Sequence, residues 1–127
     1  MIKNFLIINF TGKNDSIGLK MNNNFFVKKI QTNIRKNGLL VNNILRFIKQ
    51  KKGKIDKDFS VIVNIGPGSF SGIRISLAIA KGIKLARNAS IYGYKDSDLV
   101  QFNLKNIDLL IKKNLIENNL IKPIYLS

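Results

Sequence analysis

The sequence predicts an α+β domain in which helices pack on a mixed five-stranded sheet. Three observations support this prediction. The first thirty residues alternate between short apolar runs and turn residues, which is typical of an antiparallel meander. Residues 38–51 then place their apolar side chains at a helical period. Residues 61–93 follow the order strand, helix, strand, and this order combined with the meander gives a mixed sheet.

The meander is expected to contain three strands joined by polar turns. The strands span residues 2–9, 16–21 and 25–30, and the turns span 12–15 and 22–24. In the second strand Ile17, Leu19 and Met21 share one face, as in a half-buried strand.

The first helix is expected over residues 38–51 and is amphipathic. Its apolar face consists of Leu40, Ile44, Phe47 and Ile48. A loop over 55–60 leads from this helix into the next strand.

A strand, a glycine-rich turn and a long helix make up residues 61–87. Val61 begins an apolar run typical of a strand buried on both faces. Gly66, Pro67 and Gly68 then form a sharp turn, because proline fixes its own φ and glycine tolerates angles closed to other residues. The helix is expected from about Ser71 to Arg87, with Ser69 and Ser71 each able to cap its first N–H groups.

Small side chains recur every fourth residue along this second helix. Ala78, Gly82 and Ala86 form the stripe, which lets a sheet or another helix approach closely.

The C-terminal part is expected to be shorter and helical. Residues 90–93 form a fifth strand, Asp96 or Ser97 caps a helical turn, and a helix follows over 109–117. The domain organisation expected from this order is a lobe over 1–94 and a helical tail over 95–127 that packs on it.

The strand–turn–helix segment raises the possibility of an anion site, with Gly66, Gly68, Ser69 and Ser71 as a candidate phosphate-binding turn. The spacing matches neither a Walker loop nor a dinucleotide fingerprint. One helix terminus contributes roughly 0.3 to 2 kcal/mol to anion binding, whereas micromolar affinity needs about 8 kcal/mol. A packing turn is therefore the favoured interpretation.

Composition excludes several classes of function. The chain of 127 residues contains no cysteine and no histidine, so disulfides, thiolate catalysis and the usual zinc sites are excluded, and no metal or cofactor is expected. A reducing cytoplasm fits the absence of cysteine, so a cytoplasmic protein is expected. No apolar stretch is long enough to span a bilayer, and the N-terminus is interpreted as a strand rather than a signal peptide. The net charge of +15 is compatible with weak tRNA contact. However, isoleucine, lysine and asparagine supply 56 residues, as a coding bias toward A and T would produce.

The motif GPGSFSGIR over residues 66–74 resembles the GPGSFTG signature of the TsaB (YeaZ) family, in which an aliphatic residue and arginine follow. Ser71 replaces the usual threonine and keeps the hydroxyl. The similarity continues through residues 76–83, and the ending over 123–127 resembles the family's C-terminus. The resemblance implies one lobe of the actin-like ATPase (ribonuclease-H-like) fold, with most of the second lobe missing.

The resemblance also implies a function. TsaB proteins are the non-catalytic partners of TsaD-type catalytic subunits in forming threonylcarbamoyladenosine in tRNA, and a TsaE-type ATPase is a further candidate partner. The implied partner surface combines the two helices, and a homodimer is the alternative when the partner is absent. The residues expected there are Leu40, Ile44, Ile48, Ser69, Phe70, Gly72, Arg74, Ala78, Gly82 and Ala86.

Catalytic groups expected of an enzyme of this class are missing. Actin-like ATPases carry an aspartate at the end of the first strand, where this chain has Asn9, and the paired histidines of TsaD are absent. Two alternatives stay open beside the scaffold: a small nucleotide-binding enzyme that uses the 66–72 turn, and a basic tRNA-contacting module that uses Lys51, Lys52 and Lys54.

Overall fold

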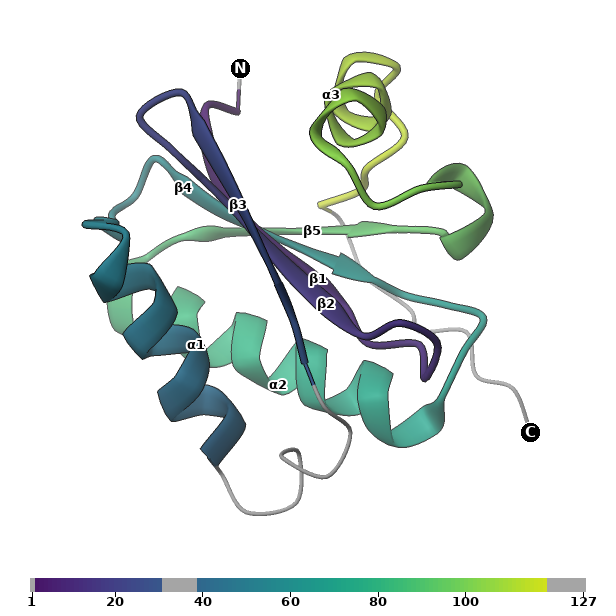
Figure 1. The fold of residues 1–127 in the computed structure, drawn as a ribbon, viewed down its shortest axis with the longest axis horizontal. Helices are drawn as coiled ribbons and strands as arrows, with labels where there is room; N and C mark the ends of the chain where they lie inside the picture. The colour runs from purple at the N-terminus through teal and green to yellow at the C-terminus, as the bar shows by residue number, and fades with distance from the viewer. Residues whose placement is uncertain (1, 31–38, 119–127) are drawn as a thin grey trace.

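A five-stranded sheet with helices on both faces forms the framework of the computed structural model, which describes residues 2–30 and 39–118 (Figure 1). The strands are β1 (Asn4–Asn9), β2 (Ser16–Met21), β3 (Asn24–Lys29), β4 (Phe59–Asn64) and β5 (Ser90–Tyr94). The helices are α1 (Leu39–Gln50), α2 (Phe70–Arg87) and α3 (Leu104–Lys112), with a short 3₁₀ turn η2 (Asp96–Asp98). The predicted helix start at Gly38 and the ending over 123–127 lie outside the described residues.

The strand order is β3-β2-β1-β4-β5, which confirms the predicted mixed sheet. β1, β2 and β3 pair antiparallel, as expected of a meander, whereas β4 pairs parallel with both β1 and β5. The β2–β3 hairpin closes with Asn22 and Asn23 at φ of 52° and 70°. Two consecutive left-handed residues are typical of the type I′ turn, whose twist matches that of the flanking strands.

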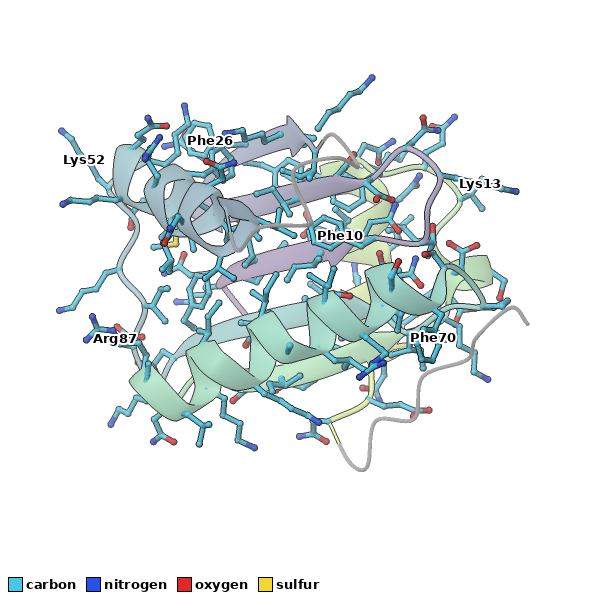
Figure 2. The ribbon with its side chains drawn as sticks, turned by 90° about the horizontal axis from the view of Figure 1, so that it is seen from below. Phe10, Lys13, Phe26, Lys52, Phe70 and Arg87 are labelled. Atoms are coloured by element: carbon cyan, nitrogen blue, oxygen red, sulfur yellow. The ribbon has the colours of Figure 1, made fainter. Side chains whose placement is uncertain are left out.

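Alternating side chains of the central strands supply a core on each face of the sheet. Leu6, Ile8, Val61 and Val63 face α1 and α2, which both cover this side of the sheet (Figures 1 and 2). The intervening side chains face α3 in a second cluster, composed of Phe5, Ile7, Ile62, Tyr94, Ile107 and Leu110. Successive side chains of a strand point to opposite faces of the sheet, so every second one is available to pack against α3.

Several element bounds differ from those predicted. The first strand begins at Asn4 rather than at residue 2, and β4 begins at Phe59, inside the expected loop. The last helix begins and ends earlier than predicted, because the Asn103 side chain accepts a hydrogen bond from the Asn106 N–H at 2.9 Å and caps it. Beyond the helix, Asn114 adopts a left-handed φ of 58°.

The segment after α3 returns to the sheet instead of continuing as a helix. Glu117 forms an antiparallel bridge with Gly93. The two backbone hydrogen bonds have nitrogen-to-oxygen distances of 2.8 and 2.9 Å. In η2 the expected side-chain cap is not formed, since Lys95 occupies the N-cap and makes no such hydrogen bond. No described helix is both long and apolar enough to cross a membrane.

Candidate docking groove and glycine-rich turn

The N-terminus of α2 is set by one of the two serines expected to cap it. Ser69 is the N-cap, and its hydroxyl accepts from the Gly72 N–H at 3.3 Å. Ser71 lies inside the helix, with its hydroxyl 3.3 Å from that of Ser69, so the expectation that both serines cap the helix is corrected. At the other end Asn88 takes a left-handed φ of 58° and closes the last turn through its N–H to the Lys84 carbonyl.

Replacing Ser69 by alanine removes this cap and is expected to lower the free energy of unfolding by about 1 kcal/mol. Urea unfolding monitored by circular dichroism measures the change. Ser71→Ala is the matched control, because no N–H group of the described residues donates to its hydroxyl, and it should cost less than half as much. Equal losses in the two variants would contradict this assignment of the cap.

Asn64 connects the turn to the carboxyl ends of three strands. Its side-chain Nδ2 donates to Asn9 Oδ1 at 2.8 Å and to Asp96 Oδ1 at 3.0 Å. Its Oδ1 accepts from the Gly66 N–H at 2.8 Å, and Gly66 has a φ of +98° that favours glycine. Asn9 therefore takes part in a structural amide network.

The glycine-rich turn packs directly against the loop between β1 and β2. The Ser69 N–H donates to the Thr11 carbonyl at 2.9 Å. A Cβ added at Gly68 would lie 2.7 Å from Thr11 Cβ and 3.0 Å from Thr11 Cα. Because the N–H groups of Gly66, Ser69 and Gly72 already donate within the chain, these contacts favour a packing turn over a phosphate cradle.

Tyr94 lies at the end of β5 and is 1% exposed. Burial raises the pKa of its hydroxyl well above the usual range, and the charge of Asp96 raises it further. The hydroxyl therefore stays protonated at neutral pH.

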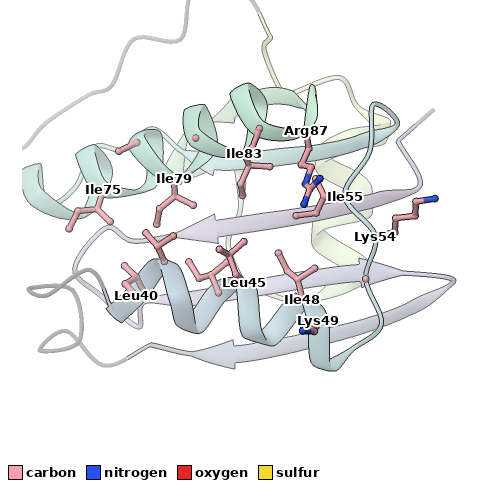
Figure 3. A pocket seen from close by; sticks show the side chains of 16 residues that line it. Leu40, Leu45, Ile48, Lys49, Lys54, Ile55, Ile75, Ile79, Ile83 and Arg87 are labelled. Atoms are coloured by element: carbon pink, nitrogen blue, oxygen red, sulfur yellow. The ribbon is translucent and has the colours of Figure 1, made fainter.

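An apolar groove of about 940 Å³ runs between α1 and α2 (Figure 3). Ile75, Ile79 and Ile83 line its α2 side. Ala78, Gly82 and Ala86 also line it, and all three are exposed rather than packed on the sheet. The small-residue stripe therefore faces outward, where a Cβ built at Gly82 would meet no described atom within 4 Å.

The α1 residues expected to add docking area lie deeper than predicted. Leu40, Ile44 and Ile48 are 1–3% exposed and belong to the chain's own core, so they form only the floor of the groove. The apolar side chains that α1 does expose there are Val41 and Leu45, at 41% and 46%. Neither residue is predicted from the helical period, although both directly follow Leu40 and Ile44 and widen the apolar face of the helix.

The remaining predicted interface residues lie at the N-terminal end of α2. Figure 2 shows Phe70 at this end and Arg87 at the opposite one. Phe70 is 51% exposed, and the Arg74 guanidinium carbon lies 4.9 Å from the centroid of its ring, in cation–π geometry. Gly72 is buried and Ser69 half-buried, so Phe70 and Arg74 are the members of this group that present surface.

Solved structures share the fold of this chain. YeaZ from Pseudomonas aeruginosa matches 76% of this chain with a TM-score of 0.63 at 16% identity. A crystal structure of an uncharacterized protein with similarity to peptidase YEAZ, also from Pseudomonas aeruginosa, matches 77% with a TM-score of 0.65 at 15% identity. No protein-family model and no curated protein matches the chain.

These likenesses establish the fold. The chain has the fold of one lobe of the actin-like ATPase, or ribonuclease-H-like, class. It covers 47% and 45% of the two solved chains and so spans less than half the length of either.

Proposed function

We propose that this chain is a non-catalytic scaffold subunit that binds and activates a TsaD-type catalytic subunit in the formation of threonylcarbamoyladenosine in tRNA. The observation that carries the proposal is the outward-facing stripe of Ala78, Gly82 and Ala86 beside the apolar groove. Exposed small residues at helical spacing allow a partner helix to approach the backbone of α2 closely. The motif over 66–74 and the YeaZ-like fold support the choice of partner.

The two helices supply exposed apolar side chains for a stable complex. A specific interface buries about 800 Å² on each partner. The groove adds the exposed side chains of Val41 and Leu45 to the α2 stripe, and Phe70 lies further along the same helix. Exposed apolar side chains gathered along neighbouring helices are typical of protein interaction sites.

Co-expression with the TsaD-type subunit encoded by the same genome tests the proposal. We expect the two chains to co-purify, and the pair to form threonylcarbamoyladenosine in tRNA faster than the catalytic subunit alone. The chain by itself should form none. Failure of the wild-type chains to associate, together with modification at the same rate with and without this chain, would overturn the proposed function.

The alternative, a nucleotide-binding enzyme, makes a different prediction for the isolated chain. It requires tight ATP and Mg²⁺ binding by the isolated chain, which calorimetry detects. The N–H groups of Gly66, Ser69 and Gly72 already donate to Asn64, Thr11 and Ser69, which weighs against that outcome.

A further inference from the structure

One end of the groove is lined by cations. Lys49 comes from the last turn of α1, Lys54 from the loop that follows, and Arg87 from the last turn of α2 (Figure 3). All three are exposed. Within residues 2–30 and 39–118 none of them forms an ion pair, since the salt bridge found there joins Lys20 and Asp108. The groove thus combines an apolar length with a positively charged end.

Among residues 2–30 and 39–118, no acidic side chain lines the groove. The sequence has seven acidic residues: Asp15, Asp56, Asp58, Asp96, Asp98, Asp108 and Glu117. None of them is among the residues around the groove. A second copy of this chain docked groove to groove would therefore bring more cations and no counter-charge, and each copy carries +15.

From this charge distribution we infer that the groove receives a helix of a different protein. That helix has one apolar face and carries carboxylates where it meets Arg87, Lys54 and Lys49. The inference rests on the proposed function and adds the charge of the partner's docking helix at this end of the groove.

Three features of the groove select this occupant. The apolar lining from Ile75 to Ile83 requires an apolar face, which the phosphate backbone of RNA does not present. The small residues spaced by four on α2 fit the ridge of a helix. The cations at one end set the register of the helix, because complementary charge fixes register and suppresses wrong partners.

Charge reversal at this end tests the inference with calorimetry against the TsaD-type subunit of the same genome. The triple variant Lys49→Glu, Lys54→Glu, Arg87→Glu is expected to weaken binding about tenfold to a hundredfold at low salt. The loss should shrink at higher salt, where exposed charges are screened. The matched control reverses Lys105, Lys112 and Lys113, which belong to α3 and the residue after it on the opposite face of the sheet. It changes the net charge equally and should leave binding within about twofold.

Any other outcome overturns the inference, and each one points to a different explanation. Equal losses of affinity in both triple variants would indicate a long-range electrostatic field rather than an acidic partner at this end. If Gly82→Leu abolishes binding but the triple variant of Lys49, Lys54 and Arg87 binds normally, the proposed function stands and the acidic helix is excluded. Absence of wild-type binding would overturn the proposed function together with the inference. Self-association through the groove, seen by sedimentation and lost in the groove triple, would replace the acidic partner with a second copy. Loss of tRNA binding by the chain alone, confined to the groove triple, would replace it with RNA.

Discussion

Replacing Gly82 by leucine is expected to raise the melting temperature of the isolated chain while weakening partner binding at least about a hundredfold. A glycine in a helix interior is less favourable than other residues by about 1 kcal/mol, which corresponds to roughly 4 °C for a domain of this size. The new side chain meets no described atom within 4 Å, so the isolated chain gains this stability without strain. In the complex the same side chain fills the space that the partner backbone needs, and a rigid interface does not absorb four additional carbon atoms.

Differential scanning calorimetry and titration calorimetry with the TsaD-type subunit measure the two effects. Leu85→Trp is the matched control, because Leu85 lies on the same helix, is 88% exposed and does not line the groove. This variant should bind normally. Stabilisation of the Gly82→Leu chain with unchanged affinity would show that the groove is not the docking surface.

Replacing Gly68 by alanine is expected to lower the free energy of unfolding by about 2–3 kcal/mol. The added Cβ would lie 2.7 Å from Thr11 Cβ and 3.0 Å from Thr11 Cα. Because one of these atoms belongs to the backbone, the β1–β2 loop must move away from the turn to relieve the overlap.

Urea unfolding of Gly68→Ala and Gly82→Ala compares the same chemical change at two sites. The first should destabilise the chain, and the second should stabilise it by up to about 1 kcal/mol. Adding Thr11→Gly to Gly68→Ala should recover part of the loss, since it removes the Cβ and Cγ2 atoms that the alanine meets. A Gly68→Ala chain as stable as the wild type would contradict the close approach of the loop and the turn.

Local patterns in the sequence are sufficient to predict most of the strands and helices. The alternation of Ile17, Leu19 and Met21 predicted β2 with its observed bounds, and the apolar run from Val61 predicted a strand that is buried at every position. The last helix begins before the predicted residue 109, because its start is set by the Asn103 cap. Helix ends depend on a few capping contacts, which are weaker signals than hydrophobic period.

The functional surfaces are harder to predict, because they depend on which face of each helix packs against the sheet. The period of α2 showed that Ala78, Gly82 and Ala86 share one face, but a close approach by the sheet or by a second helix fits that period equally well. In the structure Ser76, Ile79, Ala80 and Ile83 face the core, so the stripe faces outward. The Asn64 network joins residues 55 and 32 positions apart, and no local pattern signals such a contact.

The two outer strands determine whether the sheet can be extended by another chain. An unpaired strand edge is a template for polymerisation, which proteins prevent by covering the edge or by placing charge along it. The bridge between Gly93 and Glu117 covers part of the outer side of β5. On β3 the exposed ammonium groups of Lys28 and Lys29 would repel a second copy that is equally basic. At high concentration the chain should therefore resist fibre formation through its strand edges, and association should take place through the α1–α2 face.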